Sequence, residues 1–144
     1  MAFKINIGGK SGKTYKLEAN APGLIDKEIG EKIDGKELKG DLEGYEFEIT
    51  GASDKAGFPS IKEAPGQILQ GALLKYGKGM HKKPRREGKK PAKDRKPKGL
   101  RLRKTVRGKV ISEAVVQVNL KVIKDGKKPL TEIFASAEKP AESA

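Results

Sequence analysis

The sequence predicts a mainly β protein: a small antiparallel β-barrel-like domain with an extended basic arm and a short disordered C-terminal tail. Several segments alternate apolar and polar residues with period two, which is typical of half-buried strands. Residues 75–109 carry a dense run of Lys and Arg, and the last ten residues are small and polar. A small barrel is the expected arrangement of the strands because it leaves no exposed sheet edge.

The first strand pair is expected at residues 3–7 and 15–19, where apolar and polar side chains alternate. The connecting loop at residues 8–14 ends in Gly-Lys-Thr and superficially resembles a phosphate-binding P-loop. A P-loop would need glycine at the position of Ile7, and a helix should follow it. Strand sequence follows instead, so we predict a β-hairpin without a nucleotide site.

The middle of the chain has weaker signals. Residues 24–35 have room for one helical turn, which Gly30 would end. A turn is expected at Gly40 and Asp41, followed by a strand at residues 45–49 with its aromatic and aliphatic side chains on one face. Residues 61–76 fit a short helix or a buried strand equally well.

The strongest strand signal covers residues 116–122, followed by a turn at 124–127 and one further short element at 129–134. A long strand after the basic run suggests that the arm is an excursion from one domain. The predicted division is a first part of the domain at 1–77, the arm at 78–104, returning strands of the same domain at 105–134 and a disordered tail at 135–144.

Composition excludes several classes of function. The chain has no cysteine and one histidine, so a disulfide scaffold, a thiolate metal site and a zinc cluster are not expected, and no cofactor is predicted. Glu46 and Glu48 are better explained as the wet face of a strand than as catalytic carboxylates, so we do not expect an enzyme. No signal peptide or membrane span is predicted, and the expected location is the cytoplasm.

The positive charge is concentrated in one segment. Residues 75–109 contain 17 Lys or Arg and two acidic residues, a formal charge of +15, whereas the other 109 residues carry 15 basic and 17 acidic residues, or −2. Such a block repels itself and stays extended until a polyanion neutralises it. We therefore predict that residues 78–100 are disordered without a bound polyanion.

This segment could be a solvated protein surface, a membrane-binding segment or a nucleic-acid-binding segment. A solvated protein surface normally mixes both charge signs. A membrane-binding segment interleaves large apolar residues on a helical face, but here Gly and Pro interrupt the run. Between Met80 and Val106 the only large apolar residues are Leu100 and Leu102. Nucleic acid is favoured, because Lys and Arg on phosphates release condensed counterions.

Four sequence blocks then carry a resemblance. They are, in order, GASDKAGFP at residues 51–59, KPRR at 83–86, RLRKTVRG at 101–108 and ISEAVVQVNL at 111–120. Together they resemble the family of small-subunit ribosomal protein six of the eukaryotic and archaeal type, over most of residues 1–124. The resemblance implies a structural, ribosomal RNA-binding protein of the small subunit with a β-barrel-like N-terminal domain.

The chain departs from the family pattern in three places. Leu100 stands where the family usually has Glu, residues 87–98 look longer than usual, and the long C-terminal helix and serine-rich tail of eukaryotic members are missing. Phosphorylation control is therefore not carried over, and the length resembles that of archaeal members.

The predicted mechanism is a rigid domain that presents an arm to RNA phosphates. Arginines are expected to bridge phosphate oxygens, while lysines act as point charges. Residues 78–104 contain no Phe, Tyr or Trp, so readout of RNA shape and backbone is expected. His81 could stack on a base, but a lone histidine in a basic run is more often one more polar contact. The predicted RNA-binding residues are Lys82, Lys83, Arg85, Arg86, Lys89, Lys90, Arg95, Arg101, Arg103, Lys104 and Arg107.

The expected partners are small-subunit ribosomal RNA and neighbouring small-subunit proteins, with the chain a monomer in the ribosome and no membrane partner. The alternative is a free DNA-binding regulator, because Gly30-Glu31 also resembles the Gly-Asp turn of swapped-hairpin barrels. That alternative requires a self-complementary dimer surface and side chains held rigidly at base edges. A flexible arm supplies neither, so the ribosomal hypothesis is preferred.

Overall fold

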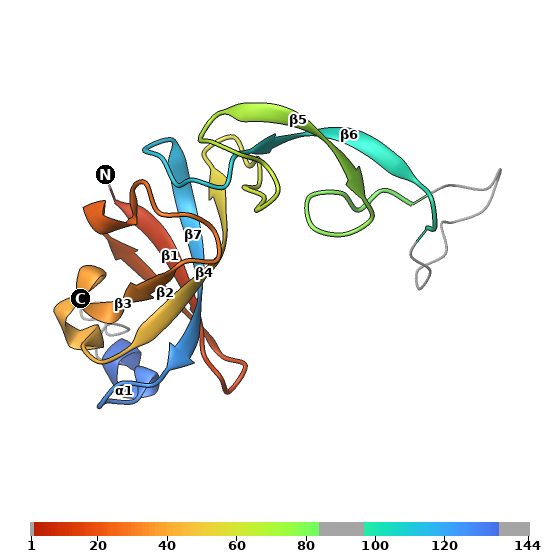
Figure 1. Cartoon of the computed structure of the whole chain (residues 1–144). Coiled ribbons are helices and arrows are strands. Elements are labelled where there is room, and N and C mark those ends of the chain that lie inside the picture. Colours follow the sequence, from red (N-terminus) through yellow and green to blue (C-terminus); the bar gives the residue numbers. More distant parts are fainter. Residues whose placement is uncertain (1, 84–96, 136–144) are drawn as a thin grey trace, which may run out of the picture.

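The computed structural model describes residues 2–83 and 97–135 of the chain. Five strands form one sheet in the order β2-β1-β7-β4-β3, and two more form a separate ribbon that projects away from it (Figure 1). The strands of the sheet are β1 (Phe3–Gly8), β2 (Thr14–Ala19), β3 (Lys32–Asp34), β4 (Glu46–Asp54) and β7 (Val115–Lys124); those of the ribbon are β5 (Leu69–Lys75) and β6 (Arg101–Arg107).

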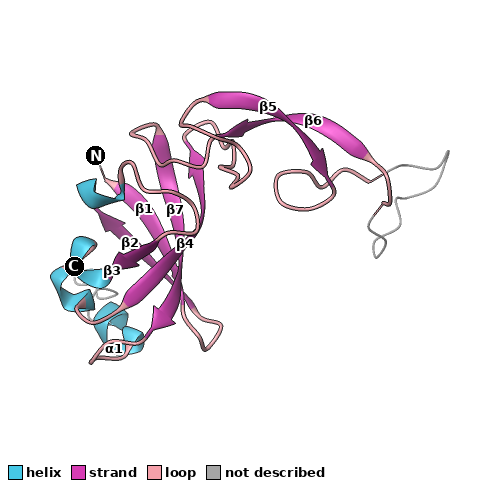
Figure 2. Cartoon of the chain, viewed as in Figure 1, coloured by secondary structure: helices cyan, strands magenta, loops and turns pink. Residues whose placement is uncertain are grey.

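Short helices gather on one side of the sheet (Figure 2). They are the 3₁₀ helices η1 (Pro22–Leu24), η2 (Gly35–Glu37) and η3 (Gly40–Leu42) and the α-helix α1 (Leu130–Ala135). Alternation in the strands turns one apolar face toward them, because successive side chains of a strand point to opposite faces. Ile5, Phe47 and Val118 are completely buried on this face and pack in one cluster with Leu24 and Leu42 from the helices.

The predicted closed antiparallel barrel is wrong. Across the described residues, the sheet ends at β2 on one side and at β3 on the other, and β1 pairs with β7 in parallel. Two strands that could have extended the sheet, β5 and β6, pair with each other outside it. The helices, rather than further strands, cover the apolar face, so the hydrophobic core does not require the sheet to close.

The strand predictions from alternation are otherwise confirmed. β1 and β2 form the expected hairpin, with Ile5 opposite Leu17, and β4 and β7 contain the two later strands that were expected. The undecided stretch at 61–76 is a loop followed by a strand, β5. The helical turn expected within residues 24–35 lies slightly earlier, because η1 already ends at Leu24.

Two described elements fall within the ends of the predicted arm. Residues 77–80 form a hydrogen-bonded turn, and β6 begins at Arg101, inside the segment expected to be extended. The predicted disorder of residues 84–96, and of the tail at 136–144, lies outside the described residues. Residue 104, the predicted end of the arm, lies inside β6, so that strand crosses the expected boundary with the domain.

Candidate nucleic-acid interface

The ribbon presents basic side chains on its outward face. β5 and β6 are antiparallel, with Leu73 opposite Arg103 and Lys75 opposite Arg101. Residues two apart on a strand share a face, so Lys75, Arg101 and Arg103 point to the same side. All three are exposed. The stem of Arg103 lies over Gly71, since a Cβ on that glycine would be 3.6 Å from the arginine Cγ.

The opposite face of the ribbon has a small core of its own. Leu74 and Val106 are buried there in a cluster with Ile61, Ala64 and Met80. Lys104 is on this face by its position in the strand, yet its side chain is exposed. Exposed cations therefore lie on both faces of the ribbon, which suits a partner that surrounds it better than a partner that covers one side.

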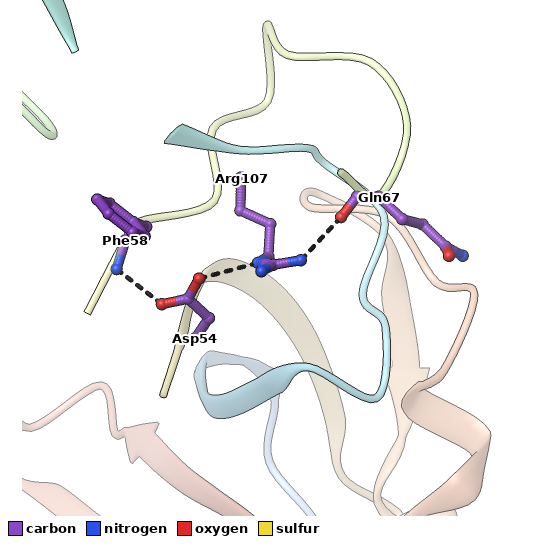
Figure 3. Close-up of polar contacts among 4 residues, drawn as sticks. All are labelled: Asp54, Phe58, Gln67 and Arg107. Atoms are coloured by element: carbon purple, nitrogen blue, oxygen red, sulfur yellow. Dashed lines mark hydrogen bonds and ion pairs between the residues drawn. The ribbon is translucent and has the colours of Figure 1, made fainter. Parts of the chain in front are cut away.

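An ion pair joins the base of the ribbon to the sheet (Figure 3). Arg107 Nε donates to Asp54 Oδ2 at 3.1 Å, and Nη1 donates to the carbonyl oxygen of Gln67 at 3.1 Å. The backbone N–H of Phe58 donates to the other carboxylate oxygen at 2.8 Å. The Asp54 and Arg107 side chains are only 3% and 13% exposed. The Arg107 guanidinium therefore makes its contacts within the protein.

These contacts also set the ionisation of the carboxylate. Burial alone would raise the pKa of Asp54, but the hydrogen bonds from Phe58 and Arg107, together with the charge of Arg107, outweigh it and hold the pKa below its ordinary value. Asp54 is thus the charged partner of Arg107 at neutral pH. The pair stabilises the junction mainly because either group would be buried without compensation if the other were lost.

Backbone hydrogen bonds fix the same junction. The chain after β6 runs between two other segments: Arg107 N–H donates to the oxygen of Pro59 at 2.9 Å, and Ile29 N–H donates to the oxygen of Lys109 at 3.0 Å. Gly108 allows this close approach, because a Cβ there would be only 1.9 Å from the backbone oxygen of Gly66. The ribbon is therefore anchored on both sides of its exit from the sheet domain.

A lysine provides a second connection between the ribbon and the sheet. The register of β4 against β7 shifts between Ile49 and Gly51, a β-bulge in which Thr50 has no paired residue on β7. Lys78 Nζ donates to that oxygen at 3.0 Å and would be 2.9 Å from a Cβ on Gly51. Partial burial lowers the pKa of Lys78. The bulge and the absence of a side chain at Gly51 thus leave room for the Lys78 amine next to the Thr50 oxygen.

The predicted RNA-binding residues fall into three groups. Arg101, Arg103 and Lys104 are exposed on β6, and Lys82 is exposed in the loop after β5. Lys83 is half-buried with its amine 5.6 Å from the centre of the Tyr76 ring. Arg107 is the ion-paired residue at the base. The remaining five lie outside the described residues: Arg85, Arg86, Lys89, Lys90 and Arg95.

The residues that sequence reasoning missed are Asp54, Lys75 and Tyr76. Asp54 carries no local signal, since its partner Arg107 is 53 residues away. Lys75 was counted in the basic segment but not selected, although its place on β5 puts it beside Arg101 on one face. Tyr76 was passed over as part of an undecided apolar run; its position directly before the arm was the available signal.

Charge pairing separates the ribbon from the sheet domain. In the domain, Lys10 pairs with Asp125 at 2.7 Å, Lys36 with Glu43 at 2.8 Å and Lys39 with Asp41 at 2.8 Å, among others. Among the described residues no carboxylate forms an ion pair with the exposed cations of β6, which are Arg101, Arg103 and Lys104. These cations of the ribbon are therefore available to an external polyanion.

Comparison with known proteins decides the family. The family model described as "Ribosomal protein S6e" matches residues 3–135. The chain belongs to the Ribosomal protein S6e family. Two relatives named "Small ribosomal subunit protein eS6" are each 40% identical to it: that of Methanoculleus marisnigri, covering 97% of this chain and 98% of the relative, and that of Archaeoglobus fulgidus, covering 96% and 99%.

Membership of the S6e family makes the chain a structural constituent of the small ribosomal subunit, located with the ribosome in the cytoplasm, and not an enzyme. A third relative of the same name, from Methanothermobacter thermautotrophicus, is also 40% identical over 96% of this chain. These relatives are archaeal. None of the described helices has the length and apolar character needed to cross a bilayer.

Proposed function

We propose that this S6e chain binds ribosomal RNA through phosphate contacts made by its basic arm, and thereby supports small-subunit assembly and translation. The observation that carries the proposal is the set of exposed cations without carboxylate partners on β6, on a ribbon anchored to a sheet domain in which lysines such as Lys36 and Lys39 form ion pairs. Repulsion among these cations is relieved when phosphates approach, and counterion release adds affinity.

Individual cations have different roles in this proposal. Arg101 and Arg103, exposed on one face, are positioned to bridge phosphate oxygens through their guanidinium groups, with Lys75 beside them as a point charge. Lys104 contacts phosphate from the opposite face. Arg107 holds the base of the ribbon instead, because its guanidinium already has Asp54 and Gln67 as partners. The proposed set also keeps the predicted cations outside the described residues, which are Arg85, Arg86, Lys89, Lys90 and Arg95.

We also propose neighbouring small-subunit proteins as partners of a monomeric chain. The support is the position of the exposed large apolar side chains among the described residues: Ile68, Leu69 and Leu73 are 72%, 43% and 54% exposed, and all lie in or next to β5. Grouped apolar side chains on a surface mark contact sites. Phosphate groups of RNA are charged and would not bind these apolar side chains.

The salt dependence of RNA binding tests the proposed phosphate contacts. With roughly 6 to 8 contacts, the logarithm of the binding constant should fall against the logarithm of salt concentration with a slope of about −4 to −7. The double variant Arg101→Gln and Arg103→Gln should flatten that slope by about 1 to 2 units, and should do so for many RNA sequences alike. Fluorescence anisotropy at several salt concentrations measures both quantities.

A matched double variant in the sheet domain, Lys36→Gln with Lys39→Gln, removes the same charge from residues that already pair with Glu43 and Asp41. Its slope should equal that of the parent protein. If both double variants flatten the slope equally, affinity follows net charge rather than the ribbon, and the proposal fails. A loss confined to one RNA sequence would indicate base contacts instead.

A further inference from the structure

The end of β5 holds a small aromatic cluster next to the basic arm. Tyr76 follows β5 directly, on the same face as the buried Leu74, and is half-buried. The chain then turns back: Gly77 N–H donates to the Met80 oxygen at 2.8 Å, and Met80 N–H donates to the Gly77 oxygen at 3.2 Å. Met80 is 1% exposed in the core of the ribbon. The backbone just before His81 is therefore fixed by both a turn and a buried side chain.

This turn places His81 against Tyr76. The two rings meet edge to face, with centroids 5.8 Å apart and planes at 86°. His81 is exposed, whereas Tyr76 is packed against the core of the ribbon, so the tyrosine supports the imidazole from one side. Lys83 holds its amine 5.6 Å from the centre of the Tyr76 ring, a cation–π contact. The cluster thus combines a supported flat ring with a nearby cation.

Phosphate binding does not require this arrangement. An exposed imidazole held by a half-buried tyrosine adds nothing to the core, which Met80 and Leu74 already fill. A supported flat ring beside cations is, however, what proteins use to bind single-stranded nucleotides: a base stacks on the ring while its phosphates meet Lys or Arg. Lys82, exposed next to His81, is in position for such a phosphate.

We propose that His81, supported by Tyr76, stacks on an unpaired RNA base, with Lys82 and Lys83 on the adjacent phosphates. This inference rests on the proposed RNA binding and assigns to it a preference for a bulged or looped nucleotide. Because every base has a π face, the site selects an unpaired base over a paired one and not one base over another. His81 is the binding residue, and Tyr76 is the positioning residue behind it.

The test compares two hairpin RNAs that differ at one bulged position, one with adenine and one with an abasic residue that keeps the phosphate. His81 is the only histidine in the chain, so its imidazole protons can be followed by NMR in the full-length protein without further assignment. With the adenine bulge, these protons should move upfield because of the ring current of a stacked base. With the abasic bulge they should not.

Affinities measured with the same RNAs give a second readout. The parent protein should prefer the adenine bulge by roughly 5-fold to 100-fold, the range expected for one stacked base. His81→Ala should abolish this preference with its salt slope unchanged, and His81→Phe should keep it. The matched variant Lys82→Gln should keep the preference but flatten the slope by about 0.7 to 0.9.

Equal affinity and equal imidazole shifts for the two RNAs would overturn the stacking proposal while leaving phosphate binding intact. The same conclusion would follow if His81→Phe behaved like His81→Ala. Failure of the parent protein to bind either RNA in a salt-dependent way would instead refute the proposed function, and stacking with it.

Discussion

The sheet domain and the ribbon are held in their conformations by different means. The domain has one extended core between its sheet and its helices, and several of its lysines, among them Lys10 and Lys36, are paired with carboxylates. The ribbon has a core of five buried residues, three exposed aliphatic side chains and exposed cations. A two-stranded ribbon is marginally stable in water by itself. The conformation of the ribbon must therefore depend on its junction with the domain. Substitutions at this junction should affect the ribbon more than the sheet.

Gly108→Ala, which adds a Cβ where the backbone leaves no room, should destabilise the protein most. A Cβ there would be 1.9 Å from the Gly66 oxygen and 2.4 Å from its carbonyl carbon, so the backbone must move. Gly108→Ala should cost at least about 3 kcal/mol, the upper end for overpacking. Amide hydrogen exchange should show the loss at the ribbon and its base, with β1, β4 and β7 less affected.

Gly40→Ala is the matched control, because nothing lies within 4 Å of a Cβ at that position in the sheet domain. It should change the free energy of unfolding by less than about 1 kcal/mol. Equal destabilisation by the two variants would show that the junction is no more sensitive than the rest of the chain.

Loss of the ion pair between Asp54 and Arg107 should have the second largest effect on the free energy of unfolding. Asp54→Asn keeps the shape of the side chain but leaves the Arg107 guanidinium, 13% exposed, without its counter-charge. We expect a cost of roughly 2 to 3 kcal/mol at neutral pH. Chemical denaturation gives the total, and amide exchange at Arg107 and Gly108 shows where protection is lost.

The difference in free energy of unfolding between the parent protein and Asp54→Asn should become smaller in acid. The folded-state pKa of Asp54 is lowered, so the carboxylate contributes stability above the unfolded-state value of about 3.9 and loses it as pH falls through the lower folded-state value. The free energies of unfolding of the parent and of Asp54→Asn should therefore converge in acid, below about pH 4. A difference that stays constant as the pH falls well below about 4 would mean that the pair is not the source of the stabilisation.

The smallest expected effect concerns Lys78. Lys78→Met keeps most of the side-chain volume but removes the hydrogen bond to the Thr50 oxygen in the β4 bulge, at a cost of about 0.5 to 1.5 kcal/mol. Lys75→Met is the control, since Lys75 is exposed on the outward face of the same ribbon. Slower amide exchange across 77–80 in the control than in Lys78→Met would support the contact; identical exchange would contradict it.

The strands with one dry face could be predicted, and those of the ribbon could not. Residues 46–49 of β4 and 118–122 of β7 alternate between buried and more exposed side chains, because one face of the sheet packs on the core and the other is more open to solvent. In β5, Leu69 and Leu73 point outward and Leu74 points inward, so apolar residues occupy both faces and the alternation disappears. In β6, Leu102 and Val106 do lie on one face, but the intervening cations made the segment resemble an unstructured arm.

The candidate site was predicted by type of residue rather than by arrangement. Charge density identified Arg101, Arg103 and Lys104 as exposed cations, and the structure adds that they divide between two faces. Charge density could not identify Arg107 as an internal residue, because its partner Asp54 lies on another strand, far away in the sequence. Strand partners depend on tertiary packing, which also explains why the period-two signal supported strands but not the predicted barrel.

The parallel pairing of β1 with β7 has a consequence for synthesis of the chain. These two strands occupy central positions of the sheet, yet Ile5 and its neighbour Val118 are 113 residues apart in sequence. During translation, β1 and β4 emerge long before the strand that joins them, and closing so long a loop is slow. The residues of the ribbon therefore leave the exit tunnel before the sheet can be completed. The nascent basic segment is available to polyanions at a time when its supporting domain is unfinished, and only chains extended past β7 can hold it in place.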